Sequence, residues 1–154
     1  MEVGECDSPP TSATMAKPFR TSRIVEFSDT DMAGIMHFAS FFRYMESAEH
    51  EMLREWGFSI FDEFDGQNIS FPRVAVSCEY HSPARSEDVL DIEISVRTIG
   101  KKSITYGLHF SCDDREVATG EVTAVCCRIE YGKPLKSVEI PAPLVAHLQE
   151  LLET

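Results

Sequence analysis

The chain has 154 residues, of which 43% are hydrophobic and 26% charged, the size and balance of a single globular domain. Its formal net charge is -12, which argues against broad nucleic-acid binding, because that needs a basic face to displace counterions from phosphates. No apolar run approaches the roughly 20 residues that cross a bilayer. The cysteines include no C-x-x-C pair, which predicts neither a zinc site nor a disulfide framework, so we expect reduced thiols in a cytoplasmic protein.

The beginning of the chain divides into a tail, a strand and a loop. Residues 1–17 are rich in Ser, Thr, Pro and Gly, which predicts a disordered tail and leaves residues 18–154 as one domain. A short strand is expected over residues 21–28. Residues 29–34, with the sequence DTDMAG, are rich in turn formers and predict a loop.

A long amphipathic helix is the clearest element of the sequence. Between Ser40 and Trp56, apolar residues recur at spacings of three and four, and polar residues fill most of the opposite face. Ser40 is the expected N-cap, and Gly57 can end the helix in a left-handed C-cap.

Beyond the helix, the hydrophobic period changes to alternation. Residues 58–70 look like a mixed connector, and a short helix is expected after Pro143. Alternating apolar residues predict strands over 74–80, 90–98, 104–110 and 116–129, with Gly120 as a candidate β-bulge. Strands joined in sequence by tight turns form an antiparallel sheet. The sequence therefore predicts an α+β fold in which a long helix packs on a curved antiparallel sheet of about five strands.

The densest polar cluster lies between the first predicted strand and the long helix. Its sequence is FSDTDMAGIMHF, in which Asp29 and Asp31 flank Thr30 and Gly34 follows. A carboxylate is thus placed close to a helix N-terminus, where unpaired N–H groups and the helix dipole favour negative charge. Such a site suits the oxyanion that forms at an acyl carbon. The two acids could instead only cap the turn or the helix, and we expect Asp29 to order the loop.

The run EFSDTDMAGIMHFASFFRYMESAEHEMLREWG resembles the start of the 4-hydroxybenzoyl-CoA thioesterase family, in the YbgC-like branch of the hotdog superfamily. The resemblance continues through FPRVAVSCEYHSPARSEDVLDIEI, GKKSITY and PLKSVEIP, and it covers most of the chain. It implies a hotdog fold and hydrolysis of an acyl-CoA substrate to free acid and CoA, without metal or cofactor. It also implies active sites at the interface of a homodimer, which often pairs into a homotetramer.

The resemblance implies roles for individual residues of the loop. Asp31 matches the catalytic acid, acting either as nucleophile through a mixed anhydride or as general base on water. The backbone N–H of Phe38 matches the donor that polarises the thioester carbonyl, with His37 beside it. Some relatives carry a histidine at position 38 and an aromatic residue at position 37. We therefore interpret His37 either as a second catalytic group or, more simply, as a packed structural histidine.

Basic residues complete the implied site. Lys101, Lys102 and Lys136, with Ser103, match positions that hold the CoA phosphates, although the first two could be ordinary turn lysines. Glu46 is a candidate for the acyl pocket or, by default, a solvated or interface carboxylate. It lies four residues before His50, the spacing of a metal pair, but no further ligands are evident and we expect no metal.

Two other functions fit the sequence less well. A hotdog enoyl-CoA hydratase needs an Asp and a His together on the helix-entry loop, whereas Asp31 and His37 are six residues apart and the expected Asn-Pro element is missing. A non-catalytic acyl-CoA-binding module would need a lost or blocked carboxylate, whereas Asp31 is present. Aromatic and aliphatic acyl groups are both compatible with the chain.

Overall fold

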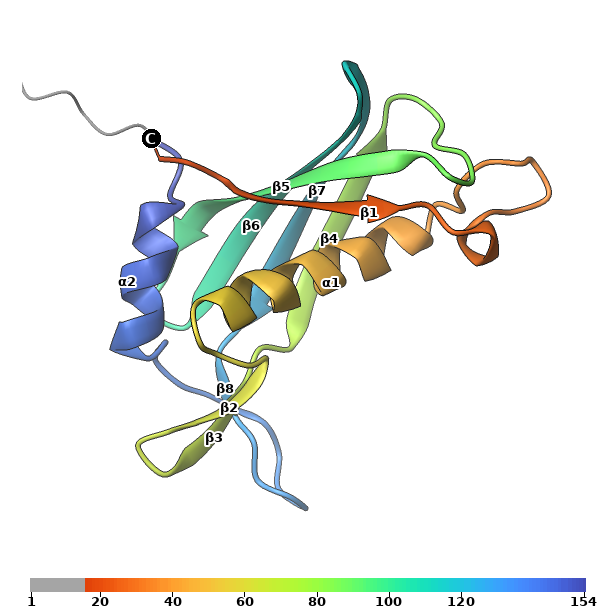
Figure 1. Cartoon of the computed structure of the whole chain (residues 1–154). Coiled ribbons are helices and arrows are strands. Elements are labelled where there is room, and N and C mark those ends of the chain that lie inside the picture. The colour runs from red at the N-terminus through yellow and green to blue at the C-terminus, as the bar shows by residue number, and fades with distance from the viewer. Residues whose placement is uncertain (1–15) are drawn as a thin grey trace, which may run out of the picture.

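The computed structural model describes residues 16–154 and contains one long helix, one short helix and two sheets (Figure 1). The predicted tail falls largely on residues 1–15, which lie outside the described residues. In chain order the elements are β1 (Phe19–Ile24), a 3-10 turn (Phe27–Asp29), α1 (Ser40–Glu55), β2 (Phe61–Phe64), β3 (Gln67–Ser70), β4 (Arg73–Tyr80), β5 (Val89–Ile99), β6 (Ser103–Cys112), β7 (Arg115–Val125), β8 (Cys127–Arg128), β9 (Lys136–Ser137) and α2 (Ala142–Glu150).

The main sheet has five strands in the order β1-β5-β6-β7-β4, and every neighbouring pair is antiparallel. Helix α1 lies across one face of this sheet (Figure 1). Strands β1 and β4 form its two edges. The predicted α+β layout, with one long helix on five antiparallel strands, is confirmed.

Alternation along the strands builds the core between sheet and helix. In β5, Leu90, Ile92, Ile94 and Val96 are fully buried, and the residues between them point to the other face. Helix α1 supplies the facing layer with its buried side chains at helical spacing. Those side chains are Phe41, Tyr44, Met45, Ala48, Met52 and Leu53.

Gly120 is not a bulge, and that prediction is wrong. Its neighbours in the sheet, Cys78 and Leu108, pair with it in regular register. Glycine leaves room there for the Met45 side chain: a Cβ at position 120 would lie 2.2 Å from Met45 Cε, so the end of that side chain would have to shift. The glycine thus lets α1 approach the sheet closely.

The entry to α1 differs from the prediction. Strand β1 ends at Ile24, and the predicted end of the strand is occupied by the 3-10 turn. The N-cap is Ala39, without a side-chain hydrogen bond, while the Ser40 hydroxyl donates to the Asp29 carbonyl at 3.3 Å. At the other end, Gly57 has the expected left-handed conformation, with φ of +83°.

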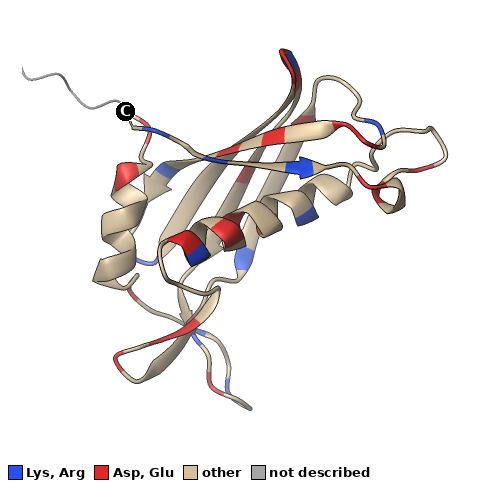
Figure 2. Cartoon of the chain, viewed as in Figure 1, with Lys and Arg blue, Asp and Glu red and all other residues tan. Residues whose placement is uncertain are grey.

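The predicted connector over 58–70 contains the β2–β3 hairpin, which joins β8 and β9 in a second small sheet below the first (Figure 1). Periodicity did not indicate this hairpin because its strands have only four residues each. Helix α2 packs beside β5 and buries Leu144 and Leu148. Acidic and basic residues are interspersed over sheet and helix (Figure 2). Among residues 16–154, no helix is both long and apolar enough to cross a membrane.

Candidate active site

A tight loop between the 3-10 turn and α1 carries Asp31. Thr30 pairs with Met36 in an antiparallel bridge, and the Asp31 N–H donates to the Ile35 carbonyl at 3.0 Å. The Gly34 N–H donates to the Asp31 carbonyl at 2.9 Å, and Gly34 adopts a φ of +73°. Glycine takes this left-handed conformation without strain, so the loop can close on itself and hold Asp31 in place.

The Asp31 side chain faces a cavity. Its Oδ1 accepts a hydrogen bond from the Ala33 N–H at 2.9 Å, while Oδ2 has no partner among the described residues. The cavity has a volume of about 570 Å³, and its wall is mostly apolar. It is lined by Asp31, Ile35, Met36, Phe38, Phe41, Tyr80, His81, Ser82, Pro83 and Ala84. One carboxylate oxygen is therefore available to a molecule in the cavity.

The backbone N–H of Phe38 is a fixed and unused donor beside the same cavity. The His37 carbonyl accepts from the Ser40 N–H at 2.9 Å, which orients the peptide between His37 and Phe38. Because that peptide is trans, the Phe38 N–H points the opposite way. It has no hydrogen-bond partner in the described part of the chain. The Tyr80 hydroxyl donates to the Phe38 carbonyl at 2.9 Å and so fixes the next peptide as well.

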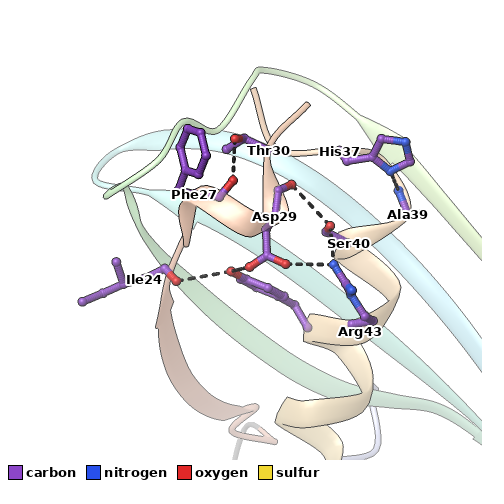
Figure 3. A network of polar contacts seen from close by, with 9 residues as sticks. Ile24, Phe27, Asp29, Thr30, His37, Ala39, Ser40 and Arg43 are labelled. Carbon is purple, nitrogen blue, oxygen red and sulfur yellow. Dashed lines mark hydrogen bonds and ion pairs between the residues drawn. The ribbon is translucent and has the colours of Figure 1, made fainter. Parts of the chain in front are cut away.

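The surroundings of His37 are those of a packed histidine. Its Nδ1 accepts a hydrogen bond from the Ala39 N–H at 3.2 Å (Figure 3). The ring stacks on Phe38 with centroids 4.5 Å apart. His37 does not line the cavity around Asp31. These contacts favour the structural reading of His37 over a second catalytic group.

Asp29 ties the loop to α1 (Figure 3). Its Oδ1 accepts from Arg43 at 2.8 Å, and its Oδ2 accepts from the Tyr44 hydroxyl at 2.7 Å. Burial, followed by the hydrogen bond to Asp29, raises the pKa of Tyr44 to about 12, so the hydroxyl stays protonated. The Asp29 carbonyl accepts from the His37 N–H at 2.8 Å. Asp29 therefore orders the loop, as its position in the motif indicated, whereas Tyr44 and Arg43 had no signal in the sequence.

The remaining predicted residues lie away from Asp31 in the same chain. Lys101 and Lys102 form the turn between β5 and β6, with Ser103 as the first residue of β6. Asp31 lies at the opposite end of β5, where the strand begins. The loop that carries Asp31 is held there by Met36, whose N–H donates to the carbonyl of Ala84, five residues before the first residue of β5. Strand β5 has 11 residues and spans about 33 Å at ~3.3 Å per residue.

Lys136 belongs to the same distant end. It lies in β9, which pairs with β8 directly after β7. Within one chain the structure therefore brings Asp31 and Phe38 together, but neither with the proposed phosphate-binding residues.

Glu46 lines a separate cavity of about 210 Å³ between α1 and β4. Its neighbour Glu49, which was not predicted as a site residue, is only 4% exposed and accepts a hydrogen bond from Arg73 at 2.6 Å. Burial raises the pKa of Glu49 to about 7, against the opposing effect of the Arg73 guanidinium. Glu49 follows Met45 by four residues, which places it on the apolar face of α1. That spacing could have predicted from the sequence that Glu49 is buried. Burial was not predicted because other acidic residues lie close to Glu49 in the sequence, so it looked like part of a charged, solvent-exposed face.

His50 lies one turn beyond Glu46, with its Nε2 3.9 Å from Glu46 Oε1. In the described part of the chain, no group of three or more His, Cys, Asp or Glu side chains is arranged to hold a metal ion.

Comparison with known proteins assigns the family. The model of the thioesterase-like superfamily matches residues 25–149. The chain is 27% identical over 133 residues to the acyl-CoA thioester hydrolase YbgC of Escherichia coli O6:H1, covering 86% of this chain and 96% of that protein.

Two solved structures share the fold. A gentisyl-coenzyme A thioesterase superimposes with a TM-score of 0.72 at 29% identity, covering 82% of this chain and 99% of that one. A 1,4-dihydroxy-2-naphthoyl-CoA thioesterase from Synechocystis superimposes with a TM-score of 0.77 at 20% identity, covering 87% and 97%. The hotdog fold and the family expected from the sequence are confirmed. The chain belongs to the thioesterase-like superfamily.

Proposed function

We propose that this protein hydrolyses an acyl-CoA thioester to a carboxylic acid and CoA, with Asp31 as the carboxylate that drives the reaction. One observation carries the proposal: Asp31 and Phe38 line the same cavity, and Asp31 Oδ2 and the Phe38 N–H have no hydrogen-bond partner among the described residues. Family membership and the named activity of YbgC support the same chemistry. The apolar wall of the cavity suits an acyl group.

The reaction has two routes with the same products. In one, Asp31 attacks the carbonyl carbon, the C–S bond breaks, and water hydrolyses the mixed anhydride. In the other, Asp31 takes a proton from water as the water oxygen attacks the same carbon. In both, the Phe38 N–H stabilises the negative carbonyl oxygen, and the CoA thiolate leaves and is protonated by solvent. The carboxylate, water and a backbone donor supply every step, so the proposal includes no metal or cofactor.

The proposal includes a homodimer joined through β4. This strand is an open edge of the sheet. Its side chains Val74, Val76 and Tyr80 are 62%, 52% and 46% exposed, although they are large and apolar. An edge with such side chains is a ready template for a second strand. Light scattering would report the mass of the assembly against the 17.3 kDa chain, and would separate a dimer from the homotetramer.

An antiparallel pairing of two β4 strands would complete the site. It sets the Arg73 end of β4 in one subunit beside the Tyr80 end in the other. The turn before β6 lies at the Arg73 end, because Arg73 and Ile104 both pair with Ala124. The dimer thus brings Lys101 and Lys102 of the partner subunit toward the Asp31 cavity, with Ser103 and Lys136 of the partner subunit beside them. These lysines would hold the CoA phosphates as point charges.

A cytoplasmic location is part of the proposal. The cysteines in the described residues are all free thiols: Cys78, Cys112, Cys126 and Cys127. Free thiols are typical of a reducing compartment.

A panel of acyl-CoA esters with a thiol reagent tests the activity, because it reports release of free CoA. Asp31→Asn should lower the rate by at least about a thousandfold, while His37→Ala should retain most of it. Water addition to a 2-enoyl-CoA without thiol release would instead support the hydratase. Binding without turnover would support the acyl-CoA-binding module.

A further inference from the structure

Residues 81–88, here called the wall segment, link β4 to β5 and form one side of the Asp31 cavity. The residues of this segment that line the cavity are His81, Ser82, Pro83 and Ala84. Within the segment, Glu87 has a φ of +75°, a conformation that L side chains seldom adopt. Such a backbone persists only where surrounding contacts hold it. The contacts that fix the wall segment therefore also fix the shape of the cavity.

The side chain of Arg115, the first residue of β7, supplies several of these contacts. Its Nη1 donates to the Pro83 carbonyl at 2.5 Å and to the Ser82 hydroxyl at 2.8 Å. Its Nη2 lies 3.6 Å from Asp88 Oδ2, which also accepts from the Arg85 N–H at 2.8 Å. A guanidinium can make these contacts together because its five N–H donors lie in one plane and point in different directions. One side chain thus joins both ends of the wall segment to β7.

The wall segment in turn holds the loop that carries Asp31. The Ala84 carbonyl accepts from the Met36 N–H at 2.7 Å. Arg85 Nη1 makes a longer contact, 3.4 Å, with the Gly34 carbonyl. The Gly34 N–H itself donates to the Asp31 carbonyl at 2.9 Å. A shift of the wall segment therefore reaches Asp31 through bonded neighbours on its own loop.

The other end of the loop is held from a different side. Asp29 bonds to Arg43 and Tyr44 of α1, and its carbonyl accepts from the His37 N–H, next to Phe38. The Phe38 N–H is thus fixed by α1, whereas the stretch that follows Asp31 is fixed by the wall segment. The distance between acid and donor depends on both supports.

We propose that Arg115 is a positioning residue for the Asp31 carboxylate and acts on it through the wall segment. The inference rests on the proposed thioesterase function and adds to it a residue that touches no substrate. Arg115 does not line the Asp31 cavity. Its loss should therefore slow the reaction by letting the acid drift from the reacting carbon, without removing a contact to the substrate.

Arg115→Ala tests this role through the split between kcat and KM on an acyl-CoA ester. We expect kcat to fall about tenfold with KM nearly unchanged, because a misplaced acid slows only the chemical step. Guanidinium chloride at millimolar concentration should restore part of the lost kcat, since the free cation can occupy the space that the side chain leaves. Sodium chloride at the same concentration should not. These concentrations are far below the molar range in which guanidinium unfolds proteins.

Arg97→Ala is the matched control. The Arg97 side chain is 45% exposed, against 43% for Arg115, and it also pairs with carboxylates, Glu121 at 3.4 Å and Glu153 at 3.5 Å. It lies near the end of β5 that is farther from the wall segment. This variant should keep the wild-type kcat and KM, with or without guanidinium.

Arg115→Lys is the second variant, for the case that Arg115→Ala does not fold. An ammonium keeps the charge but lacks the planar set of donors, so we expect kcat to fall severalfold.

Amide hydrogen exchange at Met36 reports the proposed link without any substrate. The Met36 N–H should exchange faster in Arg115→Ala than in wild type, because its acceptor in the wall segment is held less firmly. In Arg97→Ala it should exchange at the wild-type rate.

Three results would overturn the inference. They are a wild-type kcat in Arg115→Ala (or in Arg115→Lys where the alanine variant does not fold), a lowered kcat that guanidinium leaves unchanged, and an unchanged exchange rate at Met36. Failure of the proposed function appears elsewhere, as absence of CoA release from every ester by the wild-type protein. The exchange measurement then decides by itself whether Arg115 holds the Asp31 loop.

Discussion

Replacing Tyr44 by Phe removes a single oxygen from the network that holds the Asp31 loop. The hydroxyl donates mainly to Asp29 Oδ2 at 2.7 Å and also lies 3.2 Å from the Ile24 carbonyl, and the replacement removes both contacts. A hydrogen bond to a charged group contributes about 1.5–3 kcal/mol, so the free energy of unfolding should fall by ~2 kcal/mol. A domain with a stability of about 5–15 kcal/mol remains folded after such a loss.

The same replacement should slow the reaction, because Asp29 also holds the donor side of the site. Its carbonyl accepts from the His37 N–H, and the peptide after His37 presents the Phe38 N–H. A looser Asp29 lets that donor drift from the oxyanion position, so we expect kcat to fall about tenfold. KM should change little, because the lysines expected to hold the CoA phosphates lie elsewhere.

Two measurements check this prediction: kcat and KM on an acyl-CoA ester, and urea unfolding. Tyr131→Phe is the matched control, since Tyr131 is fully exposed at 106%. The control should match wild type in both. A Tyr44→Phe protein that loses stability but keeps the wild-type kcat would refute the positioning role. Unchanged stability would refute the hydrogen bond itself.

Three further predictions concern other parts of the molecule. The pKa of Glu49 is raised from 4.5 to about 7 in the folded protein, so its native carboxyl binds protons that the unfolded one releases. The free energy of unfolding should therefore fall by about 3 kcal/mol as pH rises from 4.5 to 7. Urea unfolding at several pH values should show this decrease in the wild-type protein and a smaller decrease in Glu49→Gln. Lys101→Ala with Lys102→Ala should raise KM severalfold with little change in kcat, because the lost contacts to CoA are equally strong in the bound substrate and in the transition state. A wild-type KM at low salt would show that these lysines do not bind CoA. Gly120→Ala should lower the free energy of unfolding by about 1 kcal/mol, the low end of the cost of overpacking, because its Cβ would lie 2.2 Å from Met45 Cε and the flexible end of Met45 must shift. A wild-type thermal midpoint would contradict this packing cost.

Periodic burial explains what the sequence predicted well. Helix α1 and strands β5 and β6 each bury one face against the same core, so their apolar residues repeat at a fixed spacing. Strand β4 shows the same alternation, although its apolar side chains Val74, Val76 and Tyr80 are exposed in the single chain. The β2–β3 hairpin was missed because short strands with few buried residues show no such repeat. Strand β1 ended early because the chain leaves the sheet for the 3-10 turn, although Val25 just beyond it remains buried.

Contacts between distant residues explain what the sequence did not predict in the site. The bond between Asp29 and Tyr44 joins residues 15 apart, and the bond between Glu49 and Arg73 joins residues 24 apart. No local pattern encodes either pair, since each depends on how α1 packs. Asp31 and Phe38 were predicted through the family resemblance, and the structure shows that one compact loop carries both.

A crystal structure with a hydrolysis-resistant ketone analogue, in which a methylene group replaces the thioester sulfur, tests the central claim most directly. We expect the ketone oxygen to lie about 2.7–3.1 Å from the Phe38 nitrogen. We expect the ketone carbon to lie about 3–3.5 Å from Asp31 Oδ2, or one bridging water away from it. A ketone bound with its oxygen away from Phe38 and its carbon out of reach of Asp31 would contradict the proposed chemistry.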